Sequence, residues 1–167
     1  MFTDRLEIRP PVEADRARMV ELWCDPAFTV FSDGDHTPDS ANERFDRFIA
    51  VAAELPYAKQ PVIERATGTI VGYAGIDWFE FEGRRELEFG WRLSTPARGK
   101  GYATEAAMAV LAVARREASG WLLCLIDPAN APSHNVARKV GFEPWRRVDM
   151  DGPVNLLRLD LGGAATG

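Results

Sequence analysis

The sequence predicts a single α/β domain with a mixed, mostly antiparallel sheet, a central parallel strand pair and flanking helices. Two observations indicate this class. Segments with the periodicity of strands alternate with segments of helical period along the chain. The strand–helix–strand unit over 85–126 requires a right-handed crossover, which makes its two strands parallel. A length of 167 residues suits one domain, expected over 1–161 with a loose tail at 162–167.

The first half of the chain is expected to contain one strand, two helices and a hairpin. Alternating apolar and charged residues predict a short strand that ends at Pro10-Pro11. Apolar residues at helical spacing predict two helices, the first closed by Asp25-Pro26. The turn Ala66-Thr67-Gly68 indicates a hairpin. The first strand contains Leu6 and Ile8, and the expected bounds are 12–24 and 40–55 for the helices and 61–65 and 69–81 for the hairpin.

The second half is expected to alternate strands and helices before a closing hairpin. The run WLLCLI at 121–126 is continuously apolar, as in a parallel strand buried on both faces. Gly141 occupies the position after a helix where glycine commonly ends it. Two last strands flank Asp151-Gly152. The other expected bounds are 85–93 for a strand, 101–117 for a helix and about 130–140 for a short helix.

Composition excludes several classes of protein. A net charge of −5 argues against a nucleic-acid-binding protein, which normally carries a basic face. No apolar run approaches membrane-spanning length, and the N-terminus lacks a signal sequence. Cys24 and Cys124 have no pairing or metal-binding spacing, and His36 and His134 stand alone, so no metal is expected. Scarce cysteine favours a cytoplasmic location.

The segment ARGKGYATEA, residues 97–106, places two glycines and two cations between a predicted strand and a predicted helix. A helix N-terminus carries unpaired backbone N–H groups and the positive end of the helix dipole. Glycines let these groups close around an anion, and Arg98 and Lys100 add positive charge. The segment therefore predicts a phosphate-binding site.

Two familiar phosphate-binding motifs fit this segment poorly. A P-loop needs Lys and then Ser or Thr after its last glycine, but Tyr102 follows Gly101. A dinucleotide-binding fingerprint has the form G-x-G-x-x-G/A, in which Thr104 would occupy the place of the third glycine. It also needs a tight turn after the strand, but residues 94–97 separate the strand from the first glycine, Gly99. Asp127, at the end of the next strand, stands where a ribose-binding acid could lie, so this alternative stays open.

The third pattern, R/Q-x-x-G-x-G/A, is satisfied by residues 98–103, and here the chain resembles the GNAT superfamily of N-acetyltransferases. ELEFGWRL followed by RGKGYATEA is similar to its ribosomal-protein-alanine acetyltransferase branch, the RimJ/RimL type. The N-x-x-S of 130–133 and the G-F of 141–142 extend the likeness. The resemblance implies the GNAT fold, acetyl-coenzyme A (acetyl-CoA) as cosubstrate, and acetyl transfer to a primary amine.

The resemblance also implies how the donor is held. Residues 98–103 would bind the pyrophosphate, mostly through backbone N–H groups, and backbone N–H groups near 91–93 would face the developing oxyanion. Asn130 would bond the pantetheine amides. The expected donor-binding residues are Trp91, Arg92, Leu93, Arg98, Gly99, Lys100, Gly101, Tyr102, Ala103, Thr104, Asn130 and Ser133.

A carboxylate on the strand before the loop is the expected general base, because an ammonium must lose a proton before attack. Strand alternation places Glu86, Glu88 and Gly90 on one face, where Gly90 would leave room for the pantetheine arm. Glu88 stands where the RimL-type E-x-G pattern carries its acid and is favoured over Glu86. The alternative is that both are solvated carboxylates on a hairpin.

The proton donor to the leaving thiolate is less clearly marked. Many members of the superfamily use a Tyr four residues before the G-F pair, but this chain has Ala137 there. The RimL-type pattern suggests Ser133 instead. Asn130 or Ser133 would equally suit a helix cap, and a thiol with a pKa of about 8.5 also permits departure without an acid.

The acceptor is expected to be a protein N-terminal α-amine or a small amine, and the sequence assigns no oligomeric state. Asp33 and Asp35 lie between the first two helices, where they would attract a cationic acceptor or simply form a polar turn. Two other classes stay open: a non-catalytic acyl-CoA-binding module and a dinucleotide-binding oxidoreductase.

Overall fold

A seven-stranded sheet in the order β1-β2-β3-β4-β5-β7-β6 organises the computed structural model, which describes residues 1–31 and 37–162. All neighbouring strands are antiparallel except β4 and β5, which are parallel. The expected sheet is therefore confirmed. The strands are β1 (Leu6–Ile8), β2 (Gln60–Glu64), β3 (Thr69–Phe81), β4 (Arg84–Leu93), β5 (Trp121–Ile126), β6 (Glu143–Asp149) and β7 (Pro153–Asp160).

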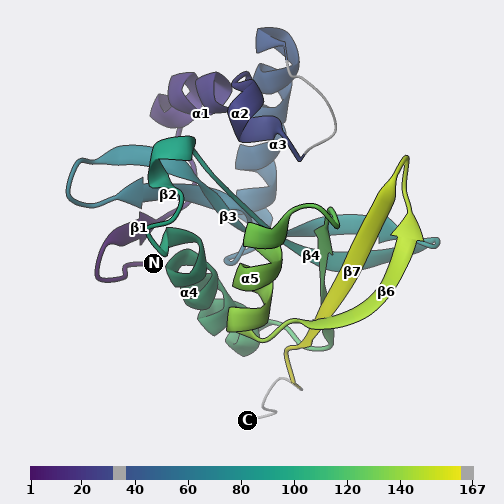
Figure 1. Cartoon of the computed structure of the whole chain (residues 1–167). Helices are drawn as coiled ribbons and strands as arrows, with labels where there is room; N and C mark the ends of the chain where they lie inside the picture. Colours follow the sequence, from purple (N-terminus) through teal and green to yellow (C-terminus); the bar gives the residue numbers. More distant parts are fainter. Residues whose placement is uncertain (32–36, 163–167) are drawn as a thin grey trace.

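Helices cover both faces of this sheet. In Figure 1, α4 and α5 lie in front of the sheet and α3 passes behind it. The helices are α1 (Arg16–Trp23), α2 (Pro26–Thr29), α3 (Pro38–Glu54), α4 (Tyr102–Glu117) and α5 (Ala131–Val140). Of the expected tail, only Gly162 is among the described residues, where its N–H donates to Asp160 Oδ1.

The first expected helix, over 12–24, is wrong in its details. A short 3₁₀ turn occupies Glu13–Asp15, and α1 begins only at Arg16. Asp25-Pro26 does close this segment, but it also opens α2, which was not expected. The Asp25 carboxylate accepts a hydrogen bond from the Ala27 N–H at 2.9 Å, and Pro26 takes the first helical position. Both residue types favour a helix start as well as a turn.

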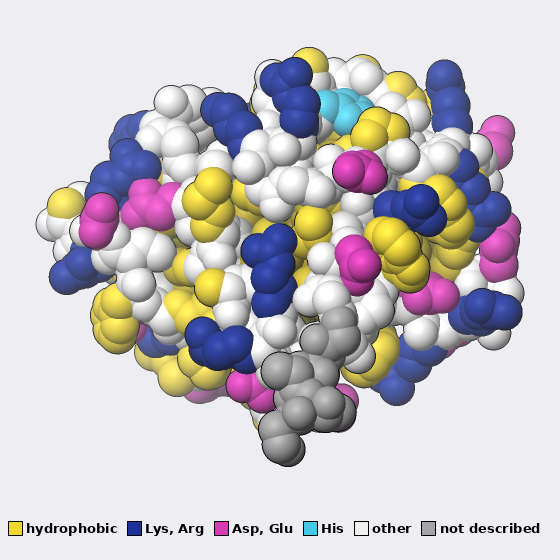
Figure 2. All heavy atoms as spheres, turned by 90° about the horizontal axis from the view of Figure 1, so that it is seen from below, with side chains coloured by type: hydrophobic (Ala, Val, Ile, Leu, Met, Phe, Trp, Pro, Cys, Tyr) yellow, Lys and Arg dark blue, Asp and Glu magenta, His cyan; other side chains and the backbone are white. Residues whose placement is uncertain are grey.

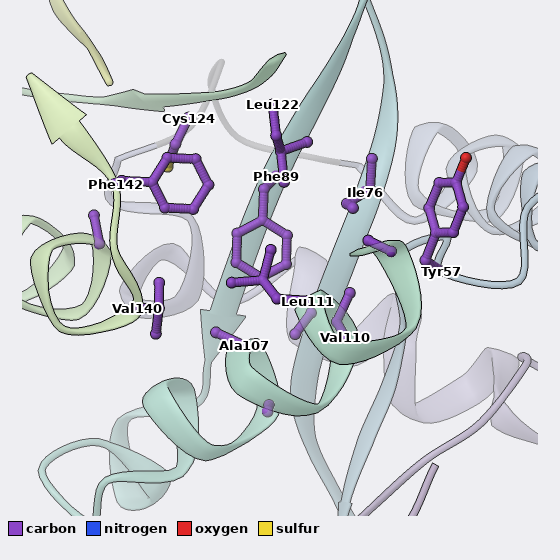
Figure 3. Close-up of a cluster of buried hydrophobic side chains, with 14 of the residues drawn as sticks. Tyr57, Ile76, Phe89, Ala107, Val110, Leu111, Leu122, Cys124, Val140 and Phe142 are labelled. Atoms are coloured by element: carbon purple, nitrogen blue, oxygen red, sulfur yellow. The ribbon is translucent and has the colours of Figure 1, made fainter. Parts of the chain in front are cut away.

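Two buried clusters hold the layers together. Between the sheet and α4, the Phe89 side chain projects from β4 toward Leu111, and its ring stacks on Phe142 with centroids 5.9 Å apart (Figure 3). On the opposite face, α1 and α3 bury a cluster that includes Trp23, Phe45 and Tyr73. Burial of both faces explains why the central strands carry so many apolar residues.

The parallel strands β4 and β5 separate after a very short contact. Only Leu87 with Leu122 and Glu88 with Leu123 are paired, whereas β4 stays paired with β3 as far as Leu93. Over Phe89–Leu93, the edge of β4 that faces β5 therefore has no strand partner in the described part of the chain. This opening positions the candidate site.

Charged side chains are mixed on the surface. On the face seen in Figure 2, Lys and Arg side chains lie interspersed with Asp and Glu side chains and with apolar groups rather than in one basic patch. Within residues 1–31 and 37–162, no helix is both long and apolar enough to cross a membrane.

Candidate active site

A cavity of about 650 Å³ opens where β4 and β5 separate. It is walled by β4, the loop before α4, the start of α5 and the end of α2. Two residues of the predicted site, Glu86 and Lys100, do not line it. The predicted residues that do are Glu88, Trp91, Arg92, Leu93, Arg98, Gly99, Gly101, Tyr102, Ala103, Thr104, Asn130 and Ser133.

The loop before α4 presents a row of free backbone donors. Gly99 and Gly101 have φ angles of +76° and +84°, which glycine adopts without the strain of a Cβ. Within the described residues, no hydrogen bond is donated by the N–H groups of 99–104; the first to bond is that of Glu105, to Gly101 O. Consecutive unpaired N–H groups at a helix N-terminus form an anion-binding site.

The two cations predicted to assist this site are directed at protein groups. Arg98 donates from Nε to Leu93 O at 3.0 Å and from Nη2 to Ala27 O at 2.6 Å. Lys100 Nζ lies 3.7 Å from a carboxylate oxygen of Glu64. Arg98 therefore fastens the loop to the end of β4 and to α2.

Arg98→Gln is expected to raise the dissociation constant for acetyl-CoA about tenfold, because losing these charge-assisted hydrogen bonds releases the loop. Lys100→Gln is the matched control. It should change the dissociation constant less than threefold, which corresponds to about 0.6 kcal/mol, since Lys100 is half exposed and its pairing is weak. Isothermal titration calorimetry measures both. Equal effects of the two substitutions would contradict an anchoring role for Arg98.

Sequence reasoning missed Arg5, which immediately precedes β1 and supports the loop. Its Nη1 donates to Lys100 O at 2.8 Å, and its Nε donates to the Glu105 carboxylate at 2.8 Å. Burial opposes ionisation of Glu105, but hydrogen bonds from Thr3 and Arg5 outweigh it and lower the pKa of that carboxyl. The pairing spans about a hundred residues and has no local sequence signal.

Glu88 reaches the cavity as half of an ion pair. Its Oε2 accepts a hydrogen bond from Lys59 Nζ at 2.7 Å, and both side chains are largely buried. Burial opposes the charge on Lys59, but the attraction and hydrogen bond of Glu88 prevail and raise the pKa of the ammonium. Lys59 was not predicted as a site residue.

Two glycines accommodate this ion pair. A Cβ on Gly75 would lie 2.1 Å from Ala58 O, so only glycine lets the segment before β2 approach β3 and deliver Lys59. A Cβ on Gly90 would lie 3.1 Å from Glu88 Oε1 and 3.2 Å from Lys59 Cε. Glu88 and Gly90 lie on the same face of β4, as expected. The space beside Gly90 adjoins the Lys59–Glu88 ion pair, and its use by the pantetheine arm stays a prediction.

Glu86 is placed away from this site. It lies opposite Phe79 in the register, two positions before Glu88, and it does not line the cavity. Of the two carboxylates proposed from the sequence, the structure brings Glu88 to the opening between the strands.

At the start of α5, Asn130 has the capping role considered from the sequence. Its Oδ1 accepts the Ser133 N–H at 3.2 Å, and its side-chain NH₂ donates no hydrogen bond among the described residues. Ser133 is half-buried and lines the cavity. Ala137, where related sequences carry Tyr, is fully buried. A role of Ser133 in protonation stays a prediction.

The remaining candidates carry no metal site among the described residues. Asp33, Asp35 and His36 lie outside those residues. His134 Nε2 lies 3.3 Å from Asp127 O. No group of three His, Cys, Asp or Glu side chains is suitably placed for a metal ion in residues 1–31 and 37–162. Cys124 lines the cavity, and burial raises the pKa of its thiol well above the ordinary value.

The loop with unbonded N–H groups lies beside the separated ends of β4 and β5 in this fold. Residues 5–143 match the acetyltransferase (GNAT) domain family, and the chain belongs to this family. The expected GNAT fold is thereby confirmed.

Curated relatives match mainly over part of the chain. The protein named uncharacterized N-acetyltransferase YnaD of Bacillus subtilis is 33% identical over 85 residues, 50% of this chain and 49% of that one. An L-methionine sulfoximine/L-methionine sulfone acetyltransferase of Pseudomonas aeruginosa is 33% identical over 84 residues, 49% of each chain. The match thus spans about half the length of these relatives.

Solved structures match over nearly the whole chain. A putative GnaT-family acetyltransferase of Bordetella pertussis superimposes with a TM-score of 0.79 at 24% identity, over 95% of this chain and 97% of that one. A phosphinothricin acetyltransferase of Sinorhizobium meliloti in complex with AcCoA superimposes with a TM-score of 0.76 at 22% identity, over 98% of this chain and 92% of that one. A ribosomal-protein-alanine N-acetyltransferase of Brucella melitensis superimposes with a TM-score of 0.76 at 21% identity, over 92% of this chain and 99% of that one. At these identities the likeness shows the fold.

Proposed function

We propose that this chain is an acetyl-CoA-dependent N-acetyltransferase that modifies a primary amine, either a protein N-terminal α-amine or a small amine. The observation that carries the proposal is the row of unbonded N–H groups over 99–104, which opens into the cavity. The likeness to the Sinorhizobium protein, whose structure holds AcCoA, supports the choice of donor.

The donor would be held in two places. The N–H groups of 99–104 would bind its pyrophosphate, since they meet an anion at the positive end of α4. The pantetheine arm would enter the opening between β4 and β5. There the unpaired edge of β4 near 91–93 would offer N–H groups to the thioester oxygen as it gains charge.

Glu88 is the proposed acceptor of the amine's proton. Glu88 Oε2 accepts the hydrogen bond of Lys59, which leaves Oε1 to take up the amine's proton directly or through a water molecule. The amine nitrogen then forms a C–N bond with the thioester carbon, and the C–S bond breaks. The electron pair leaves with sulfur and the nitrogen loses its second proton to solvent. The thiolate takes up a proton, for which Ser133 Oγ is the candidate donor, and solvent returns a proton to Ser133.

The two acceptor classes have separate support. The E-x-G and N-x-x-S patterns and the Brucella structure favour a protein N-terminus, as in the RimJ/RimL branch. The Pseudomonas relative, named for two amino-acid-like substrates, favours a small amine.

Incubation with acetyl-CoA and a mixed panel of amines and N-terminal peptides, followed by mass spectrometry, tests the proposal. We expect one acetyl group on at least one acceptor, and stabilisation by about 2.7 kcal/mol at a donor concentration about 100 times the dissociation constant. Donor binding without any acetylation would favour a non-catalytic acyl-CoA-binding module. Stabilisation by NAD or NADP and not by acetyl-CoA would contradict the proposal and favour a dinucleotide-binding oxidoreductase.

A further inference from the structure

Arg92 has a guanidinium group without a hydrogen-bond or ion-pair partner among the described residues. Its Nη1 is buried there without an acceptor. The side chain nevertheless lines the cavity. Arg92 is half-buried, and a partly desolvated guanidinium without a counter-charge favours contact with an anion when the site is filled.

The described protein offers no such anion at this place. The acidic residues lining the cavity are Glu88 and Asp127. Glu88 is bonded to Lys59, and Asp127 Oδ1 accepts the Ala129 N–H at 2.7 Å. Among the described residues the charge of Arg92 is therefore left for an anionic ligand to meet.

The position of Arg92 indicates the acceptor rather than the donor. Arg92 shares the β4 face of Glu88 and Gly90, which is opposite to the face that Phe89 packs toward α4. At about 3.4 Å per residue, its Cα lies about 7 Å from that of Gly90 and about 14 Å from that of Glu88. A compact molecule can thus meet Arg92 while its amine faces the opening beside Glu88.

The neighbours of Arg92 form a partly apolar, cationic end of the cavity. Its Cζ lies 5.9 Å from the centre of the Phe28 ring, and Tyr73 is its cross-strand partner. Phe28 and Tyr73 pack edge to face with centroids 6.1 Å apart. This end suits a molecule with a negative charge and a small apolar part.

We infer that the acceptor is a free amino acid or a close analogue, whose carboxylate binds the Arg92 guanidinium while its amine is acetylated. The inference rests on the proposed function and narrows its acceptor class. It disfavours a protein N-terminus, where the carboxylate next to the α-amine is replaced by a neutral peptide bond.

Matched acceptors test this directly. L-leucine and L-phenylalanine are each compared with their own carboxamides, which keep the side chain and the amine but remove the negative charge. The protein variants are Arg92→Gln, Arg92→Lys and, as a control elsewhere on β4, Arg84→Gln. The readouts are kcat/KM from CoA release with product mass, and the dissociation constant of acetyl-CoA from calorimetry.

The wild-type protein should favour acid over carboxamide by about 10- to 100-fold, the worth of one charge-assisted interaction. Arg92→Gln should abolish that preference and Arg92→Lys should restore part of it, while Arg84→Gln keeps it. Acetyl-CoA affinity should change little in any variant. The wild-type comparison stands even where a variant fails to fold.

Other outcomes overturn the inference. Equal turnover of acids and carboxamides by the wild-type protein, or a preference that survives Arg92→Gln, would remove Arg92 from acceptor binding. Weaker acetyl-CoA binding in Arg92→Gln with unchanged acceptor preference would assign Arg92 to the donor. Acetyl-CoA binding with no amino acid acetylated defeats this inference alone, whereas no acetyl-CoA binding defeats the proposed function.

Discussion

Glu88→Gln is expected to lower kcat/KM by about 10²- to 10⁴-fold, the usual contribution of a general base. The amide keeps the shape of the carboxylate but accepts no proton at neutral pH. Glu86→Gln is the matched control on the same face of β4. It should change kcat/KM less than threefold, which corresponds to about 0.6 kcal/mol, because Glu86 does not line the cavity. Steady-state kinetics with saturating acetyl-CoA measures both, and a larger loss in Glu86→Gln would reverse their roles.

Glu88→Gln leaves Lys59 buried beside a neutral group, so this substitution should also destabilise the fold. In the wild-type protein the pKa of Lys59 is raised above its ordinary 10.5, so its pairing stabilises the fold below that pH and is lost as pH rises through the folded-state pKa. In Glu88→Gln the attraction and hydrogen bond of the Glu88 carboxylate are lost, so burial lowers the pKa of Lys59 relative to the wild-type protein and favours unfolding at neutral pH. Urea titrations should therefore show a difference in the free energy of unfolding between the wild-type protein and Glu88→Gln that becomes smaller at alkaline pH. A difference independent of pH would contradict a charged Lys59–Glu88 pair.

Phe89→Ala is expected to remove about 3–5 kcal/mol of the free energy of unfolding, a large part of the roughly 5–15 kcal/mol typical of a domain. Phe89 is fully buried, and its ring stacks on Phe142 and contacts the Trp91 ring at 5.3 Å between centroids. Truncation would leave a cavity between β4 and α4, the two elements that frame the site.

Phe2→Ala is the matched control for this loss, because the same atoms are removed from a side chain that is 73% exposed. Its effect should stay within about 0.5 kcal/mol, as for most surface substitutions. Chemical denaturation of the two variants compares them. Similar losses at both positions would show that the core does not depend on the Phe89 contact.

The sheet and the donor loop could be predicted from the sequence because their signals are local. The apolar run at 121–126 marked the parallel strand, and alternation in 85–93 fixed which side chains face the core. Two glycines before a helix marked the loop with positive φ angles. In each case backbone geometry and residue type are coupled within a few positions.

The support around the site could not be predicted because it joins segments distant in the chain. Lys59 meets Glu88 only after the segment before β2 lies against β3, and Arg5 meets Glu105 only when β1 reaches the start of α4. The hydrogen bond of Arg98 to Ala27 O likewise depends on the position of α2, and the predicted role of Arg98 in donor binding stays a prediction. No spacing rule reports such long-range pairs.

The central claim is that the N–H groups of 99–104 hold the donor's pyrophosphate. Backbone amide NMR spectra recorded during titration with acetyl-CoA test it most directly. The account predicts large shifts for the amides of 99–104 and small ones for β1, with saturation at the calorimetric affinity. Binding of acetyl-CoA that leaves the amides of 99–104 unshifted would contradict it.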